Sequence, residues 1–173
     1  MNNTKTIKFI FTDGTELEIL TVDNILDHHD IDQVRALRPY KSIKSVTIPD
    51  SIEIIDRWAF RSMLTLHSVS LPNTIKEIRL EAFSGCCNLT SINFPDSLQI
   101  IGHMAFARTG MENVILPEKC RLDGNPFKYC KADTVSIGNK LFKKISGGNP
   151  NYIGPYPTKQ DLLNYNNTID GKN

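Results

Sequence analysis

The sequence has almost no excess of charge of either sign and no long apolar run. Its 173 residues carry 20 Lys and Arg against 19 Asp and Glu, a balance that argues against strong attraction to nucleic acid or to an anionic membrane. No apolar stretch approaches the roughly 18 residues of a transmembrane helix. The start, MNNTKTIKFIFTDGTE, lacks the apolar core and cleavage site of a signal peptide. We therefore expect a cytoplasmic protein, or an extracellular surface protein if the natural chain begins upstream of Met1.

Motifs typical of catalysis and of metal binding are also missing. The four cysteines form no C-x-x-C pair and the four histidines form no H-x-x-x-H pair, so the ligand spacing of a zinc site is absent. There is no Gly-rich phosphate loop and no nucleophile-and-histidine motif. The sequence therefore predicts a protein that is not an enzyme and that uses no cofactor and no metal. The alternative of a different class is an enzyme with an unrecognised site.

What the sequence does contain is a repeat of about 23 residues. Two kinds of residue mark it. The first is a proline that ends each apolar segment, and it recurs at Pro49, Pro72, Pro95 and Pro117. The second is a phenylalanine that closes each unit, and it recurs at Phe60, Phe83, Phe106 and Phe127. A fixed period of this length is typical of leucine-rich-repeat solenoids, in which each coil buries its apolar face against the next.

Each repeat begins with a segment in which apolar and polar residues alternate. This alternation predicts a short β-strand with one buried face, and the proline ends the strand because it cannot donate a backbone hydrogen bond. The predicted core residues are Val46, Ile48, Val69, Leu71, Ile92, Phe94, Val114 and Leu116. After the proline the apolar spacing changes to three, as in Ile52 and Ile55. We therefore expect a helical or 3₁₀ return limb.

These repeats resemble the BspA-like leucine-rich repeats, whose consensus runs Leu-x-x-Ile-x-Leu-Pro, then Ile-x-x-Ile, then Ala-Phe-x-x-Cys. The unit from Leu66 to Cys86 follows this order closely. Three units match well and the fourth matches loosely. The resemblance implies a right-handed α/β solenoid of short parallel strands, and it implies binding without catalysis. Known members are mostly bacterial or protozoan surface proteins that bind host or bacterial partners, and this chain departs from them in its missing secretion signal.

We expect three regions: an N-terminal cap (1–42), the repeats (43–145) and an irregular C-terminal cap and tail (146–173). In the N-terminal cap, a hairpin around Asp13-Gly14 with a three-residue loop pairs Phe9 with Leu17 and Ile7 with Ile19. This register is preferred because it places apolar residues on one face and sets Lys8 across from Glu18 on the other.

A short helix should follow the hairpin. Its predicted apolar face contains Ile31, Val34 and Leu37, and Asp30 is the predicted N-cap. Ala36-Leu37 lies 23 residues before Ala59-Phe60, so we interpret this helix as the return limb of a degenerate zeroth repeat. At the other end of the array, Val135 and Ile137 fit a fifth strand. Gly138 takes the proline place there, and Leu141 is next in register.

The candidate binding surface is the concave face of the strands. Residues that alternate with the core should point onto this face. They are Lys44, Ser45, Thr47, His67, Ser68, Ser70, Thr90, Ser91, Asn93, Glu112, Asn113 and Ile115. Most are small and polar, which leaves room for a partner, although a purely solvated sheet could have the same composition.

The expected partner is another protein or peptide segment. The surface lacks the Lys and Arg density that binds nucleic acid and the aromatic residues that stack bases. No membrane partner is expected, and the unbound chain should be a monomer. The predicted role is a cytoplasmic adaptor, inhibitor or effector; the alternative is a fragment or relative of a cell-surface adhesin.

Several other residues are interpreted as structural. Cys86 and Cys130 share a place in the repeat two coils apart, roughly 10 Å by strand spacing and beyond the reach of a disulfide, so we expect four reduced thiols. His28-His29-Asp30 is interpreted as a solvated segment of the cap. Trp58 should either be partly exposed or pack between coils. A small basic patch, again interpreted as solvated, consists of Lys140, Lys143 and Lys144.

Overall fold

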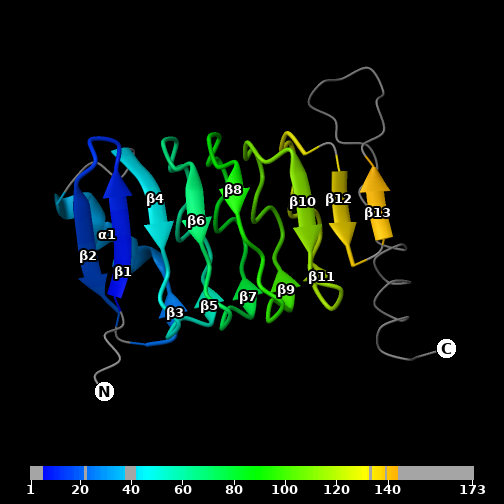
Figure 1. Ribbon diagram of the computed structural model, residues 1–173, viewed down its shortest axis with the longest axis horizontal. Helices are drawn as coiled ribbons and strands as arrows, with labels where there is room; N and C mark the ends of the chain where they lie inside the picture. Colours follow the sequence, from blue (N-terminus) through cyan, green and yellow to red (C-terminus); the bar gives the residue numbers. More distant parts are fainter. Residues whose placement is uncertain (1–5, 22, 38–41, 133, 139, 144–173) are drawn as a thin grey trace.

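The chain is wound into a solenoid whose coils stack along one axis (Figure 1). The computed structural model describes residues 6–21, 23–37, 42–132, 134–138 and 140–143, and of residues 35 and 140–143 it describes only the backbone. One side of the solenoid is formed by two consecutive sheets. The first sheet has the strand order β2-β1-β4-β6-β8, and the sheet that follows it has the order β10-β12-β13. These strands are β1 (Thr6–Phe11), β2 (Glu16–Leu20), β4 (Ile43–Thr47), β6 (Ser68–Ser70), β8 (Ser91–Ile92), β10 (Asn113–Leu116), β12 (Thr134–Ile137) and β13 (Lys140–Lys143).

The return limbs form a second parallel sheet, so the expectation of a helical or 3₁₀ limb is wrong. This sheet has the order β11-β9-β7-β5-β3. Its two-residue strands are β3 (Ile25–Leu26), β5 (Ile54–Ile55), β7 (Glu77–Ile78), β9 (Ile100–Ile101) and β11 (Arg121–Leu122). Their backbone groups bond to the neighbouring coil; for example, the Arg79 N–H donates to the Ile55 oxygen at 2.9 Å. Bonds between coils replace the bonds that a helix would form within itself.

Each return limb ends in two left-handed corners. In the first coil these corners are Trp58 and Ser62, whose φ angles are 62° and 60°. Between the corners, hydrogen bonds to the next coil alternate with hydrogen bonds within the coil. The Phe60 N–H donates to the carbonyl oxygen of Ala82 in the next coil at 2.8 Å, whereas the Arg61 N–H donates to the carbonyl oxygen of Trp58 in its own coil at 3.0 Å. Ile52, in the turn after Pro49, and Ile55, in β5, are both buried three residues apart without a helix, which is why the sequence pattern suggested one.

The core contains a continuous ladder of phenylalanine rings. Phe60, Phe83, Phe106 and Phe127 are all fully buried. Successive ring centroids are 4.9, 5.2 and 5.5 Å apart, and the rings are within 9° of parallel. The spacing is close to the separation of strands in a sheet, because equivalent residues of successive coils lie directly over one another.

The predicted strand residues line this core. Six of the eight are buried. The exceptions, Ile92 and Phe94, are half-buried but still pack against the core. Phe94 lies edge-on to Phe106, with ring centroids 5.4 Å apart and planes at 85°. The central element of the sequence-based fold is therefore confirmed.

The N-terminal hairpin has the predicted register. Phe9 is opposite Leu17 and Ile7 is opposite Ile19, and Gly14 adopts the left-handed conformation with φ 81°. The hairpin extends the first sheet, because β1 pairs antiparallel with β4. Its inward side chains, Ile7 and Phe9, are fully buried, so the hairpin covers the first coil.

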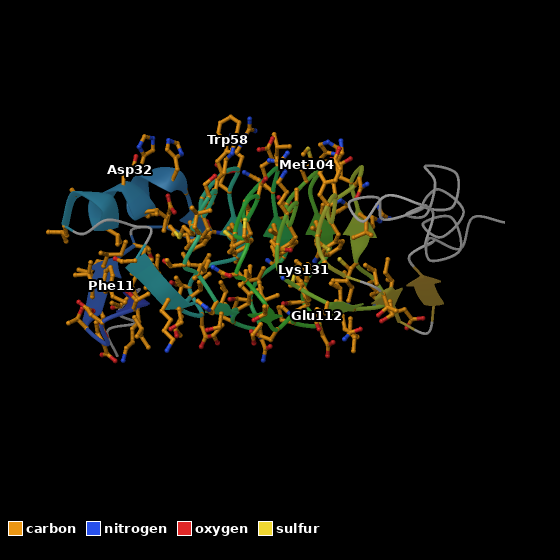
Figure 2. The ribbon with its side chains drawn as sticks, turned by 90° about the horizontal axis from the view of Figure 1, so that it is seen from above. Phe11, Asp32, Trp58, Met104, Glu112 and Lys131 are labelled. Atoms are coloured by element: carbon orange, nitrogen blue, oxygen red, sulfur yellow. The ribbon has the colours of Figure 1, made fainter. Side chains whose placement is uncertain are left out.

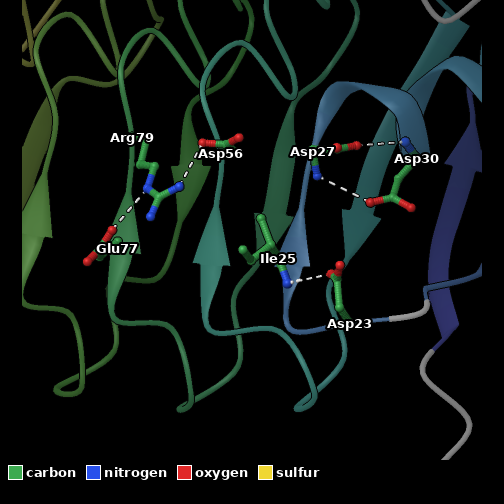
Figure 3. Close-up of polar contacts among 7 residues, drawn as sticks. All are labelled: Asp23, Ile25, Asp27, Asp30, Asp56, Glu77 and Arg79. Carbon is green, nitrogen blue, oxygen red and sulfur yellow. Dashed lines mark hydrogen bonds and ion pairs between the residues drawn. The ribbon is translucent and has the colours of Figure 1, made fainter.

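The helix α1 (His28–Leu37) differs from its prediction at both ends. Its N-cap is Asp27, whose Oδ1 accepts the backbone N–H of His29 at 2.7 Å. Asp30, the predicted cap, instead accepts the Asp27 N–H through Oδ2 at 3.2 Å (Figure 3). Leu37 is 65% exposed, so it is not part of the buried face.

No helix in the described part of the chain has the length and apolarity needed to cross a membrane.

The zeroth repeat therefore does not follow the 23-residue register. Its strand in the second sheet is β3, which pairs Ile25 with Ile54 and Leu26 with Ile55, a spacing of 29 residues. Ile31 and Val34 are the buried residues of α1, whereas Ala36 and Leu37 are exposed. The helix occupies the expected limb of the coil, but the expected alignment of Ala36-Leu37 with Ala59-Phe60 is wrong.

The fifth strand is confirmed, but the chain reverses after it. β12 pairs parallel with β10, and Val135 and Ile137 are buried. Gly138, with φ 53°, then leads into β13, which is antiparallel to β12 and places Leu141 opposite Ser136. The expected continuation of the coil through Leu141 is therefore wrong. The predicted C-terminal cap and tail, 146–173, lies outside the described residues.

Candidate binding surface

The predicted binding residues lie on the outer face of the first sheet and of β10. All are exposed except Ser45 and Ser68, which are half-buried. The strand pairing aligns Ser45, Ser68 and Ser91 in one row across three coils. The row stops at β8, because β10 belongs to the next sheet, where Asn113 is opposite Thr134. The surface thus consists of a serine-rich part on three coils and a separate part on β10.

Asn93 has a structural role that the sequence did not indicate. Its Oδ1 accepts the backbone N–H of Leu71 at 2.9 Å, and its Nδ2 donates to the Leu71 carbonyl oxygen at 2.9 Å. The side chain therefore links two coils and is not a freely mobile contact group. The only sequence signal is that an amide stands where Thr47 and Ser70 occur in earlier repeats.

The charged residues of this surface are few and have fixed surroundings. The Nδ1 of His67 lies 2.7 Å from the carbonyl oxygen of Thr65. A carbonyl can only accept, so Nδ1 carries the proton in this contact and Nε2 is left for another partner. Lys44, on the first coil, and Glu112, on the fourth, hold equivalent places in their repeats, and both are exposed. Glu112 points away from the coils on the side opposite Trp58 (Figure 2). Such a surface can form hydrogen bonds but has little net charge.

At the far end, Ile115 adds an apolar group to this surface. It is 74% exposed on β10, between the buried residues Val114 and Leu116 of the same strand. An exposed isoleucine beside hydroxyl and amide groups gives the surface one apolar contact point.

On the second sheet, by contrast, the outer charges neutralise each other. Arg79 bridges two carboxylates, donating from Nη1 to Asp56 at 3.1 Å and from Nε to Glu77 at 3.0 Å (Figure 3). These bonds raise the pKa of Arg79. Burial pushes the pKa of Asp56 upward, but the backbone N–H of Arg57 and the Arg79 guanidinium outweigh it and hold that pKa below its ordinary value. This pattern stabilises the coil stack and leaves little charge for a ligand.

A shallow hollow of about 300 Å³ lies where the cap helix meets the first coil. Trp58, at the first left-handed corner, is 41% exposed beside it, so of the two expected alternatives the structure shows partial exposure. The lining residues are His28, Ile31, Asp32, Trp58, Ala59, Arg61, Ser62 and Met63. A second hollow of about 310 Å³ lies on the second sheet, beside Arg79 and His103.

The neighbouring histidines of the cap form one close group of potential metal ligands. The ring centroids of His28 and His29 are 4.0 Å apart, and their nitrogens lie within 4.8 Å of each other and of a carboxylate oxygen of Asp27. Asp27, not the predicted Asp30, completes the group. Both imidazoles are exposed, and one oxygen of Asp27 already caps α1, so the group has the features of a solvated helix start.

The cysteines are structural thiols in this fold. Cys86, Cys120 and Cys130 are buried and Cys87 is exposed. The Cys86 thiol donates to the Phe60 carbonyl oxygen at 3.0 Å. Burial raises the pKa of Cys86 and of Cys120 to about 12. Thiols with such pKa values stay protonated near neutral pH and are poor nucleophiles.

Comparison with known proteins gives one family match. The family described as "BspA type Leucine rich repeat region" matches residues 36–147 with 6 copies. No curated protein matches the chain at a significant level.

Among solved structures, the chain is similar to a leucine-rich repeat protein from Bacteroides ovatus, with a TM-score of 0.51 and 21% identity over 70% of this chain and 31% of that chain. It is also similar to a leucine-rich repeat protein of T. pallidum (TM-score 0.40, 24% identity, 47% of this chain and 52% of that chain) and to the pneumococcal vaccine antigen PcpA (TM-score 0.42, 25% identity, 58% and 34%). The chain thus spans less than a third of the Bacteroides protein, and at this identity the similarity shows the fold alone.

Proposed function

The chain belongs to the BspA-type leucine-rich repeat family, and from this we propose that it is a non-enzymatic module that binds another protein or a peptide through the first sheet. The observation that carries the proposal is the row of aligned small hydroxyl side chains, Ser45, Ser68 and Ser91, on the outer face of the first sheet, which no other described element covers. Small side chains leave space for a partner, and such sheet surfaces are a common way for solenoids to bind.

A protein partner fits this surface better than nucleic acid or a lipid membrane. Its charged groups are a lysine, a histidine and a glutamate, so it has no cationic stripe for phosphates. Its one large apolar contact, Ile115, suits a side chain of a folded or extended polypeptide. Protein interfaces combine direct hydrogen bonds with apolar contacts, and this surface offers serine hydroxyls on three coils and an exposed isoleucine on β10.

The test is affinity capture from the native source, followed by mass spectrometry of the retained proteins. The test variant is Ser70→Arg with Ser91→Arg, since both residues are exposed on the first sheet. The matched control is Asn73→Arg with Gln99→Arg, which adds the same charge at exposed positions of the same two coils but off this face. Asn93 is left intact because its amide links the coils.

We expect the test variant to lose the partner and the control variant to keep it, with both variants unfolding at the wild-type urea concentration. Capture that survives Ser70→Arg with Ser91→Arg but is lost on Trp58→Gly would instead place the site at the hollow beside the cap helix. Glycine is used there because it accepts the left-handed backbone of Trp58. The identity of the retained protein would distinguish a cytoplasmic adaptor, inhibitor or effector from a surface adhesin.

A further inference from the structure

Three cations along the coils pair with carboxylates of the same or the neighbouring coil. Arg61 pairs with Glu81 at 3.4 Å, and Lys76 pairs with Glu53 at 2.9 Å. Arg79 forms two such pairs. Each pair is only partly buried, so its main effect is to remove net charge from the surface of the stack.

Three cations near the C-terminal end of the repeats have no such pair within the described part of the chain and gather in one place. Arg108 is the second left-handed corner of the third coil. Lys128 and Lys131 flank the equivalent corner of the fourth coil, at Tyr129. Among the residues that the structure describes, none of the three lies within ion-pair distance of a carboxylate. Arg108 and Lys131 are exposed and Lys128 is half-buried. We call these three residues, together with Tyr129, the C-terminal corner.

Tyr129 lies between two of these cations. The Arg108 guanidinium carbon is 5.7 Å from the centroid of its ring and the Lys128 ammonium nitrogen is 5.1 Å from it. The ring is 44% exposed. Cations near an aromatic face are attracted to it, so the ring keeps mutually repelling charges together while leaving them accessible to solvent.

The backbone fixes this arrangement. Arg108 and Tyr129 have φ angles of 59° and 62°, at equivalent left-handed corners of successive coils. The Arg108 N–H donates to the Lys128 oxygen at 2.9 Å, and the Lys131 N–H donates to the Thr109 oxygen at 3.2 Å. The corner is therefore a rigid part of the coil stack, and Lys131 projects from it on the side that faces the viewer in Figure 2.

The cluster is not a general property of the repeat. At the same corner the first coil has Ser62 and the second has Gly85, neither of which is charged. In the backbone register, β13 places Lys143 opposite Thr134, three residues after Lys131. Of the basic patch predicted from the sequence, the structure describes only the backbone of Lys140 and Lys143, and Lys144 lies outside the described residues.

We propose that the C-terminal corner binds an acidic segment of a partner protein, with Arg108 and Lys131 pairing with carboxylates and Tyr129 contacting the chain between them. This proposal rests on the proposed function and adds a second surface to it. Charge complementarity favours an anionic partner, because these cations lie together and none has a carboxylate at ion-pair distance among the described residues. Three cations and a single ring are too few for the phosphate tracking and repeated stacking of nucleic acid binding, and too few for stable attachment to an anionic membrane.

The test measures binding of a fluorescein-labelled oligoglutamate peptide to the full chain by fluorescence anisotropy at low salt. Arg108→Gln with Lys131→Gln should weaken binding about tenfold or more, since each lost interfacial charge pair is worth roughly a tenfold change. The matched control is Arg57→Gln with Lys119→Gln, which removes one exposed arginine and one exposed lysine elsewhere. It should change the affinity by about twofold or less.

A second pair of variants tests the ring. Tyr129→Gly removes the ring while keeping a residue that accepts φ 62°, and it should weaken peptide binding. Tyr129→Phe keeps the ring and should bind as the wild type does.

The proposal is overturned if the peptide does not bind, or if the control variant loses as much affinity as the test variant. It is also overturned if an oligouridylate or phosphatidylserine vesicles bind more tightly through the same residues, because the partner would then be a different class of molecule. The variant Ser70→Arg with Ser91→Arg separates the two proposals. If partner capture depends on those serines while oligoglutamate fails to bind, the proposed function stands and only the C-terminal corner is wrong.

Discussion

The side-chain amide of Asn93 pairs with the backbone of Leu71 in the preceding coil through two hydrogen bonds of 2.9 Å. One coil earlier, the equivalent backbone N–H of Ile48 donates to the backbone oxygen of Ser70 at 3.1 Å. Correspondingly, β4 and β6 share three residue pairs, whereas β6 and β8 share two. The amide of Asn93 therefore completes the hydrogen bonding of the sheet where regular strand pairing stops.

We expect Asn93→Ala to lower the free energy of unfolding by about 1–3 kcal/mol, because the N–H and carbonyl of Leu71 lose their partner in a partly buried position. Urea denaturation followed by circular dichroism measures this change. Ser91→Ala is the control, since its side chain is exposed on the same strand, and it should stay within about 0.5 kcal/mol of the wild type. Equal effects of the two substitutions would contradict the structural role of Asn93.

Phe83 should contribute more to stability than Phe94. Phe83 is fully buried between two stacked rings, at centroid distances of 4.9 and 5.2 Å, whereas Phe94 is half-buried and touches the ladder by an edge. Phe83→Ala should lower the free energy of unfolding by about 3–5 kcal/mol, and Leu71→Ala should lower it by about 2–5 kcal/mol. Phe94→Ala should lower it by about 2 kcal/mol or less. The measurement is equilibrium unfolding in urea, and a larger loss for Phe94→Ala than for Phe83→Ala would be incompatible with this packing.

The buried thiols predict a loss of stability in alkaline solution. The pKa of Cys86 and that of Cys120 are raised by burial from 9.0 to about 12. In the unfolded chain these thiols ionise above about pH 9, while in the folded chain they stay protonated. The contribution of these thiols to stability is therefore complete below about pH 9 and is lost as the pH rises towards about 12. Over that range each thiol lowers the free energy of unfolding by about 1.4 kcal/mol per pH unit.

The double substitution Cys86→Ala with Cys120→Ala isolates this effect. The variant will be less stable at every pH because it loses buried volume, so the informative quantity is the slope of the free energy of unfolding against pH. Between pH 9 and 10.5 we expect a clearly shallower fall than in the wild type. Parallel slopes would show that these thiols do not control the alkaline transition.

The N-terminal region should act as a cap and not as a separate domain. β1 pairs with β4 from Lys8 to Phe11, and Ile7, Phe9 and Phe11 of β1 are buried. Deleting residues 1–41 would expose the edge of β4 and the apolar side of the first coil, so we expect aggregation or a loss of cooperative unfolding. Size-exclusion chromatography and urea denaturation provide the readout. A shortened chain that is soluble, monomeric and as stable as the full chain would refute the cap.

The fold was predictable wherever one chemical constraint repeats in every coil. A coil cannot bury its apolar face alone, so the strand residues from Val46 to Leu116 had to line one core and the closing phenylalanines had to stack. The hairpin was predictable for a similar reason: only the three-residue loop puts Phe9 and Leu17 on one face. The period of the outward residues likewise placed the candidate binding surface on the first sheet.

The elements that were mispredicted depend on contacts between distant residues. An apolar spacing of three suits both a helix and a turn followed by a short strand, and backbone hydrogen bonds between coils, such as that from the Arg79 N–H to the Ile55 oxygen, decide between them. The N-cap of α1 is Asp27 and not Asp30, directly after β3, which ends at Leu26 and pairs with β5. Gly138 was expected to carry the coil onward, yet its left-handed backbone starts a hairpin.

The candidate sites show the same division. Periodicity alone indicates a solenoid with small polar residues along one face, because it fixes which residues face the core and which face outward. Only the tertiary structure showed that the amide of Asn93 completes the sheet, and only the stacking of coils brought Arg108 beside Lys128 and Tyr129, about 20 residues later. Neither relationship follows from local sequence, since each depends on which side chains meet across the gap between two coils.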